Sequence, residues 1–310
     1  MTKKFVAGLL AGAILFVGVA LVIFNYGLKH YNWTSPTVQA IVKVLPFSAM
    51  EVNRYSYSYY DYLTDWNTLQ KLMAESGQIE GMDELSLKQE ILRSALQSSL
   101  VEVLADRYDL SVTQEDYDAA WKMVLGKGEE ESVTEEELAD TVSSIYEMYG
   151  FDKDTYERRV LRVYVLSHKL GDMLAKKAMD EVATKLQAGE TFASLAAAYS
   201  DDGTAETGGD LGWFVSDDMI PEFVEKLNSM EKGQTSEVFQ TRYGYHIVYL
   251  EDLRQTEDGK TEYKASHIIK LIDGVDSMFS AEVTKVIDAE KSQADIEIYI
   301  NGVDAESLLY

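Results

Sequence analysis

The first feature of the hydrophobic pattern is a long apolar run near the start of the chain. Residues 5–24, FVAGLLAGAILFVGVALVIF, contain no polar side chain. Because an α-helix rises about 1.5 Å per residue, this run would extend roughly 30 Å, the thickness of a bilayer core. A cleaved signal peptide is the alternative, but its apolar region would be only ~7–15 residues long and would end at a small-residue cleavage site. We therefore predict a transmembrane helix over residues 5–24, after a cytoplasmic stub of residues 1–4.

The charges that flank this run predict its orientation. Lys3, Lys4 and the terminal amine slightly outweigh Lys29 and Lys43. Because positively charged flanks stay in the cytoplasm, the N-terminus is expected inside, and residues 25–45 would be a linker close to the membrane. The sequence thus predicts a single-pass protein of the cell membrane whose bulk is extracytoplasmic.

Residues from about 59 to 188 follow the helical period. A helix buried on one face is predicted by the apolar stripe of Leu92, Leu96, Leu100, Val103 and Leu104. Thr134 and Glu137 have the spacing of a capping box, which would begin another helix. The tyrosine-rich segment 54–63 predicts a short strand or turn that leads into a helix. Together these features predict a helical domain over residues 46–170.

After residue 190 the pattern becomes a mixture of helix and strand. The segment TFASLAAAYS (191–200) predicts a short helix, and Pro221 suits the first turn of a second one. The segment EVFQTRYGYHIVYLEDL (237–253) alternates in the manner of a strand, a turn and a strand. We therefore expect the α+β class, with a small antiparallel sheet flanked by helices.

Composition excludes several kinds of function. The chain has 53 Asp and Glu against 28 Lys and Arg, a net charge of −25, which argues against nucleic-acid binding and favours a body kept dispersed by self-repulsion. It has no cysteine, so disulfides, thiolate metal sites and Cys nucleophiles are excluded. The acidic run 126–140 is typical of a solvated loop and a helix start. Metal binding by its glutamates is a weak alternative, because no histidine or fixed ligand spacing accompanies them.

Two kinds of hydrolase also find little support in the sequence. The adjacent Asp201 and Asp202 would point apart, which disfavours a paired-carboxylate site. Covalent serine chemistry lacks a GxSxG-type elbow.

Five segments between residues 179 and 251 carry a family resemblance. They are GETFASLAAAYSDD, GGDLGWF, MIPEF, EKGQTSEVF and YGYHIVYL. Together they resemble a parvulin-type (PpiC, rotamase) peptidyl-prolyl cis-trans isomerase, with the domain over residues 171–254. With the apolar run and the helical segment before it, the chain is similar to the SurA and PrsA class of extracytoplasmic foldases. This implies a transmembrane helix, an α-helical chaperone-like domain and a parvulin domain.

The resemblance also implies an activity and its partners. The activity would be isomerisation of X-Pro bonds in exported or unfolded polypeptides, with no cofactor, no metal and no nucleic acid. The membrane would be a further partner through the N-terminal helix. The alternative function is a membrane-tethered holding chaperone whose parvulin module is catalytically weak.

Two sets of site residues follow from the resemblance. The apolar cup for the proline ring would be Leu211, Met219 and Phe223, for which ordinary core packing is the alternative, above all for Leu211. The polar residues around the isomerising bond would be His246, His267, Asp202, Thr241 and Ser200. The two histidines would be paired imidazoles whose shared hydrogen bonding fixes their tautomers.

One part of the family pattern is displaced. A parvulin domain ordinarily opens with a strand bearing HIL before its first helix, whereas residues 155–185 have the pattern of continuous helix. The stretch KASHIIKL (264–271) resembles that opening strand but follows the domain's closing strand. We therefore predict a circularly permuted parvulin, in which residues 255–310 supply this strand and then a helix and a final strand. The alternatives are a truncated second parvulin domain and a strand whose histidine is merely packed.

Strand register provides a check on this prediction. A two-residue turn at Asp258-Gly259 would place His267 opposite Leu250, four residues or about 13 Å from His246. Direct opposition of the two histidines therefore predicts an irregular loop or a bulge in the connection 252–262.

Overall fold

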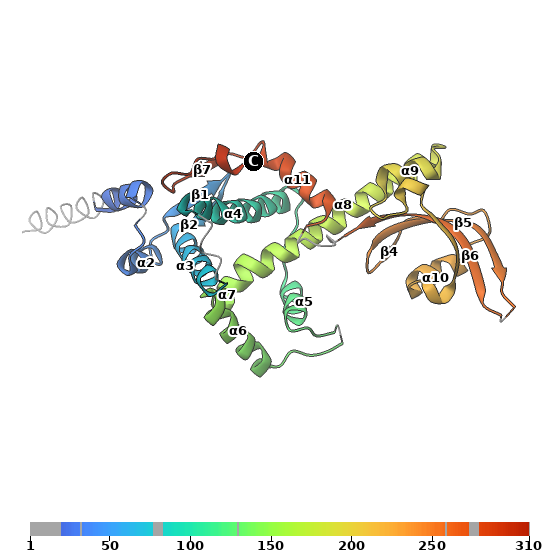
Figure 1. The fold of residues 1–310 in the computed structure, drawn as a ribbon, viewed down its shortest axis with the longest axis horizontal. Coiled ribbons are helices and arrows are strands. Elements are labelled where there is room, and N and C mark those ends of the chain that lie inside the picture. The colour runs from blue at the N-terminus through green and yellow to red at the C-terminus, as the bar shows by residue number, and fades with distance from the viewer. Residues whose placement is uncertain are drawn as a thin grey trace, which may run out of the picture. The chain divides into compact units, whose positions relative to one another are not determined.

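The computed structural model describes residues 20–31, 33–76, 83–128, 130–257, 259–272 and 279–309. The chain divides into two compact units (Figure 1). One is formed by residues 1–163 and 287–310, and the other by residues 164–286.

The structure corrects the prediction of a membrane anchor. Residues 5–19 of the predicted segment 5–24 lie outside the described residues. Within the ranges given above, no helix is both long enough and apolar enough to cross a bilayer. The described residues therefore have the α+β class with no helix that could span a bilayer, and on this finding the predictions of a transmembrane helix, of membrane attachment and of a single-pass membrane location are corrected, because the described structure supports none of them.

The first unit contains helices and a three-stranded antiparallel sheet in the order β2-β1-β7. Its strands are β1 (Ser48–Val52), β2 (Tyr55–Ser58) and β7 (Ile296–Ile298). Its helices are α2 (Pro36–Val42), α3 (Tyr59–Ser76), α4 (Glu84–Arg107), α5 (Gln114–Val124), α6 (Glu135–Tyr149) and α7 (Lys153–Tyr156), followed by a π-helical turn (Glu157–Leu161). The C-terminal end of the chain thus completes a sheet that begins near residue 48.

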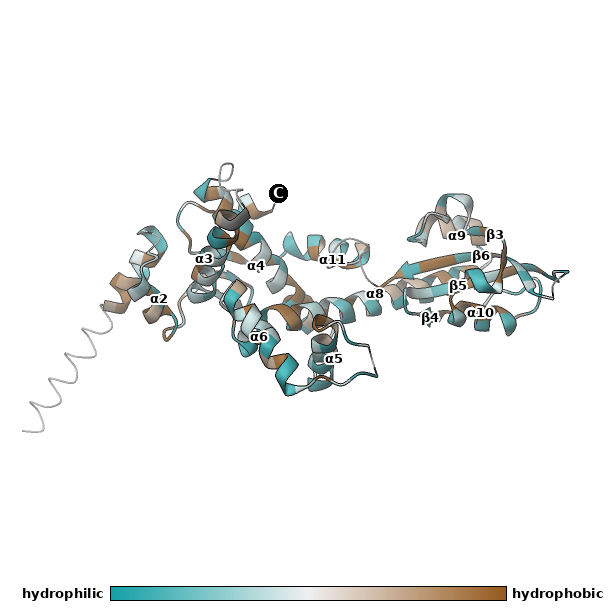
Figure 2. Cartoon of the chain, turned by 60° about the horizontal axis from the view of Figure 1, so that its bottom comes forward, coloured by the Kyte–Doolittle hydropathy of each residue, from teal (hydrophilic) through white to brown (hydrophobic). Residues whose placement is uncertain are grey.

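Three short sequence patterns that predicted helices and a strand in this unit are confirmed. All five residues of the predicted stripe, Leu92 to Leu104, are buried on α4. The Thr134 side chain caps α6 and Glu137 bonds back to the Thr134 backbone, which makes the capping box. The tyrosine-rich segment forms β2 and leads directly into α3. Figure 2 shows hydrophobic and hydrophilic residues interspersed along α6, as expected for a helix with one buried face.

The second unit is built on a four-stranded antiparallel sheet in the order β3-β6-β5-β4. The strands are β3 (Asp210–Val215), β4 (Phe239–Thr241), β5 (Gly244–Gln255) and β6 (Thr261–Leu271). The helices are α8 (Arg162–Gln187), whose first two residues belong to the first unit, α9 (Phe192–Tyr199), α10 (Pro221–Asn228) and the start of α11 (Ala281–Lys291). The strand bearing KASHIIKL is therefore central in the sheet.

Alternate residues of the central strands pack into two separate cores. On one face, Tyr245, Ile247 and Ile268 pack with Ala175, Met179 and Val182 of α8 and with Leu195 and Ala196 of α9. On the other face, Val248, Leu250, Tyr263 and Ala265 pack with Phe214, Met230, and Phe223 and Leu227 of α10. Because side chains of a strand alternate between faces, β5 and β6 are buried on both sides.

The register of β5 and β6 is neither that of a two-residue turn, which would put His267 opposite Leu250, nor that of direct opposition of the two histidines. His267 lies opposite Val248, and His246 lies opposite Ile269, so the histidines are diagonal neighbours. A bulge is present, but it lies between Leu250 and Asp252, before the connection 252–262 for which it was predicted, and the strands then stay paired as far as Gln255 and Thr261. Direct opposition was wrong because the bulge and the connection after Gln255 together shift the register by two residues from that arrangement.

Candidate active site

The candidate site begins with two buried imidazoles on neighbouring strands. His246 on β5 is 4% exposed and His267 on β6 is 9% exposed. Their ring centroids are 5.8 Å apart, with 31° between the ring planes. His267 lies opposite Val248, and His246 is two residues before Val248 on the same strand. Because side chains alternate between the faces of a sheet, both rings lie on the face that α10 covers.

Two phenylalanines enclose these rings. Phe223 of α10 presents an edge to both, with centroid distances of 5.6 Å to His246 and 5.8 Å to His267. Phe239 of β4 stacks on His246 at 5.4 Å with an interplanar angle of 22°. The imidazoles are thus buried and enclosed on these sides by aromatic rings.

Asp202 connects the site to the loop after α9. Its Oδ2 lies 2.8 Å from His267 Nε2. The hydroxyls of Ser200 and Thr204 donate to the same carboxylate, at 2.8 Å to Oδ1 from Ser200 and at 2.9 Å to Oδ2 from Thr204. Burial acts to raise the pKa of Asp202, but the hydrogen bonds from His267 and Ser200 outweigh it and leave this pKa below its usual range. An ionised carboxylate only accepts hydrogen bonds, so His267 Nε2 carries the proton of the pair.

His246 has a different polar partner. Its Nε2 lies 2.9 Å from the Thr241 hydroxyl, which also accepts the backbone N–H of Tyr243. Burial and the neighbouring His267 lower the pKa of His246 to about 4, partly offset by Asp202. Each imidazole therefore pairs through Nε2 with its own partner, and among the described residues the buried Nδ1 of each has no hydrogen-bond partner.

The three predicted cup residues lie around one apolar cluster. Phe223 is buried within it, and Leu211 and Met219 are half-buried against it. Ile220 and Phe239 pack against the same cluster. Phe223 is thus a core residue, whereas Leu211 and Met219 retain exposed surface, and the cup stays a prediction.

The structure adds residues that the sequence analysis did not single out. Phe239 stacks on His246, and Thr204 donates to Asp202. A signal for Phe239 was present, since a hairpin through Arg242 and Tyr243 pairs Phe239 with His246. Thr204 gave no such signal, because its contact depends on the course of an irregular loop.

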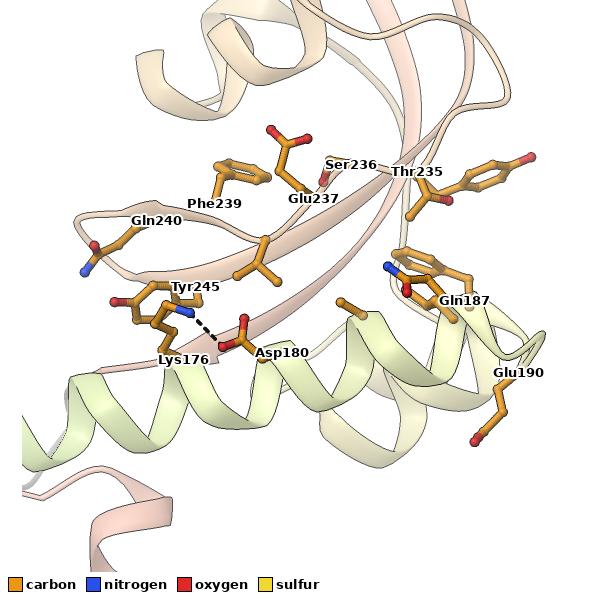
Figure 3. Close-up of a pocket in the computed structure, with 15 residues that line it drawn as sticks. Lys176, Asp180, Gln187, Glu190, Thr235, Ser236, Glu237, Phe239, Gln240 and Tyr245 are labelled. Carbon is orange, nitrogen blue, oxygen red and sulfur yellow. Dashed lines mark hydrogen bonds and ion pairs between the residues drawn. The ribbon is translucent and has the colours of Figure 1, made fainter. Parts of the chain in front are cut away.

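A separate groove lies on the other face of the sheet (Figure 3). It has a volume of about 1040 Å³ and runs between α8 and residues 235–240. Lys176 and Asp180 of α8 form an ion pair on one wall, and Tyr245 lies between the walls. Its described lining includes none of the predicted site residues, so the imidazole site is a distinct place in the fold.

Metal chemistry has no candidate site in the described ranges. No group of three or more His, Asp or Glu residues there could hold a metal ion. The polar groups at the site are instead paired with one another, as the contacts of Asp202 and Thr241 show.

The buried His246 predicts a pH dependence of stability. The unfolded chain binds a proton at this residue near pH 6.5, whereas the folded chain binds it only near pH 4. Stability is therefore fully present above pH 6.5 and declines as the pH falls towards 4. Between pH 7 and pH 5 we expect a loss of roughly 2 kcal/mol in the free energy of unfolding. Urea unfolding at the two pH values measures this loss. In the variant His246→Gln the free energy of unfolding should fall less between pH 7 and pH 5, and the difference from the wild type should equal the loss expected for His246. An equal loss in both proteins would contradict the assignment.

Comparison with known proteins agrees with this geometry. Residues 164–252 match the family model described as "Rotamase: PPIC-type PPIASE domain". The chain therefore carries a PpiC-type, or parvulin, rotamase domain. The matched segment contains β3, β4 and β5 as far as Asp252 but ends before β6, so His267 lies outside it.

The relatives that this chain matches include chaperones and foldases. "Chaperone SurA" of Hahella chejuensis is 30% identical over 162 residues, which are 52% of this chain and 34% of that protein. "Foldase protein PrsA" of Geobacillus sp. (strain WCH70) is 33% identical over 155 residues, which are 50% of this chain and 52% of that protein. The chain thus spans about a third to a half of these relatives. The crystal structure of the peptidylprolyl isomerase PrsA from Bacillus cereus aligns over 77% of this chain and 81% of that one at 20% identity, with a TM-score of 0.25, too low to support a structural argument.

Proposed function

We propose that this chain catalyses cis-trans isomerisation of X-Pro peptide bonds in unfolded polypeptides. The observation that carries the proposal is the pair of buried imidazoles on β5 and β6, bonded to Thr241 and Asp202 and covered by Phe223. The match of residues 164–252 to the rotamase family supports the same reaction.

The reaction asks for a particular environment rather than for a nucleophile or a metal. Rotation about the peptide bond has a barrier of roughly 18–20 kcal/mol, because resonance gives the bond double-bond character. No covalent bond breaks, so the protein has only to bind the twisted amide more tightly than the planar one. An apolar cup that excludes water, together with polar groups of fixed orientation, does this.

The roles of the residues follow from their surroundings. Leu211 and Met219 retain surface with which to contact the proline ring, and Phe223 backs them. Asp202 is a carboxylate held by three donors, so its charge stays in one place while the substrate amide twists. His267 and His246 orient Asp202 and Thr241, since each shares a hydrogen bond with one of them. Ser200 supports this arrangement from behind Asp202.

We further propose that the domain is circularly permuted. The strand β6 lies between β3 and β5, and its histidine contacts the Asp202 of the loop after α9. This arrangement suits a strand that takes the place of the opening strand of a parvulin, although it follows β5 along the chain. The position of β6 beyond the matched segment 164–252 supports the same reading.

Substitution of the two histidines tests the proposed activity. We expect His246→Ala and His267→Ala each to lower kcat/KM on a proline-containing tetrapeptide about tenfold, because each removes a partner that orients a polar group. A protease-coupled isomerisation assay measures this on the whole chain. The exposed His30 is the matched control, and His30→Ala should retain full activity. Wild-type turnover no faster than the uncatalysed exchange would refute the proposal.

A second candidate function is a holding chaperone. The names "Chaperone SurA" and "Foldase protein PrsA" of the relatives favour it. In that case the chain would suppress aggregation of an unfolded protein, and the same His246→Ala and His267→Ala variants would suppress it equally well. Light scattering of a denatured client during dilution separates the two functions, since isomerase turnover and aggregation can be measured on the same samples.

A further inference from the structure

Asp201 and Asp202 are adjacent in the sequence, but their carboxylates form hydrogen bonds with two different residues of β6. The Asp202 carboxylate faces His267, with Oδ2 2.8 Å from Nε2. The Asp201 carboxylate instead accepts from Lys270 of β6, with Oδ1 2.7 Å from Nζ. His267 and Lys270 are three residues apart on one strand, so they point to opposite faces of the sheet. The loop therefore engages β6 from both faces.

The backbone around Asp201 runs along the edge of β6. The Asp201 N–H donates to the Ile269 carbonyl at 2.9 Å, and the Ile269 N–H donates to Ser200 Oγ at 3.1 Å. The Leu271 N–H donates to Asp201 Oδ2 at 3.0 Å. These contacts begin beyond Ser266, where the pairing of β3 with β6 ends. Residues 200–202 thus lie beside β6 where β3 no longer pairs with it. They are held there by one backbone–backbone hydrogen bond and by hydrogen bonds that involve the side chains of Ser200 and Asp201.

Lys270 is the charged centre of these contacts. It is only 6% exposed, and its Nζ also lies 2.9 Å from Glu282 Oε1 at the start of α11. Burial acts to lower the pKa of Lys270, but hydrogen bonds with Asp201 and Glu282 outweigh it and raise this pKa above the usual value. A buried ammonium is unfavourable unless paired, so Lys270 holds the Asp201 carboxylate strongly in one position.

We propose that Lys270 is a positioning residue for the candidate active site, acting through Asp201 to aim the Asp202 carboxylate at His267. Because Asp201 and Asp202 are joined by one planar peptide unit, an Asp201 side chain that is held to Lys270 fixes the position of the backbone from which the Asp202 side chain extends to the imidazole. The inference rests on the proposed isomerase function for its consequence in catalysis. The geometric part, the dependence of the Asp202–His267 hydrogen bond on Lys270, can be measured without activity.

The experiment compares Lys270→Met with Lys264→Met in the whole chain. Lys264 lies on the same strand and forms an ion pair with Glu251 at 2.6 Å, but it is more exposed and contacts no residue of the candidate site. We expect Lys270→Met to lower kcat about tenfold with KM changed less than about twofold, since misplaced polar groups impair turnover more than binding. Lys264→Met should match the wild type. In NMR spectra of the imidazole nitrogens, the hydrogen-bonded Nε2–H signal of His267 should be lost in Lys270→Met and kept in Lys264→Met.

Two further variants keep the test decisive if Lys270→Met unfolds. Asp201→Asn keeps the size of the side chain and a bond from the Leu271 N–H but weakens the hold of Lys270, so it should shift the same His267 signal. Lys270→Arg should restore the signal and activity to within about threefold of the wild type. An unchanged His267 signal in folded Lys270→Met or Asp201→Asn overturns the positioning role. An inactive wild type with the expected NMR changes overturns only the proposed function.

Discussion

Replacement of Asp202 by leucine is expected to lower kcat/KM for prolyl isomerisation by roughly 100-fold, a magnitude typical of removing one preorganised electrostatic group. The carboxylate accepts from His267, Ser200 and Thr204, and leucine of similar size would leave all three donors without it. The fixed negative charge beside the cup would also be lost. Steady-state kinetics on a proline tetrapeptide, with circular dichroism to verify folding, measures the effect.

Asp217→Asn is the matched control for this prediction. Asp217 belongs to the same sheet unit, but it is exposed and pairs with Lys260 at 2.7 Å. Exposed ion pairs contribute little to stability because solvent screens them, so this variant should keep its fold and its activity. An Asp202→Leu protein that is folded and within threefold of wild-type kcat/KM would show that the carboxylate has no part in the reaction.

Replacement of Gly209 by alanine is expected to destabilise the second unit by roughly 2–4 kcal/mol. Gly209 has φ of +83°, and a Cβ there would lie 2.2 Å from the His267 carbonyl oxygen. Its own carbonyl accepts the His267 N–H at 2.8 Å. The backbone must therefore move away from β6, which would displace His267. Thermal or urea unfolding measures the loss, and the NMR signals of His267 report the displacement.

Gly233→Ala separates the contribution of close contact from that of backbone conformation. Gly233 has φ of +85°, nearly the same as Gly209, but no atom lies within 4 Å of a Cβ built there. Its substitution should lower stability by only about 1–2 kcal/mol, the penalty for a left-handed alanine. Equal losses at the two positions would mean that β6 yields readily to the added methyl group.

Local patterns explain why several parts of the fold could be predicted. The stripe from Leu92 to Leu104 and the capping box at Thr134 involve residues within a few turns of one helix, so sequence spacing alone decides them. The pairing of β5 with β6 was also within reach, because both strands carry distinctive motifs. The predicted membrane helix lies mostly on residues 5–19, which are outside the described residues, and no described helix meets the requirement for a bilayer span.

The sequence by itself determined the kinds of element in the second unit and the residue types gathered at the site, because strand alternation, helix caps and family motifs are read over short stretches. Only the tertiary structure decided that His246 bonds to Thr241 while His267 bonds to Asp202, and that Asp201 turns to Lys270. The physical reason is that these partners depend on the register of two long strands, which a single bulge shifts. They depend equally on a loop held by contacts some seventy residues away along the chain, as between Asp201 and Leu271.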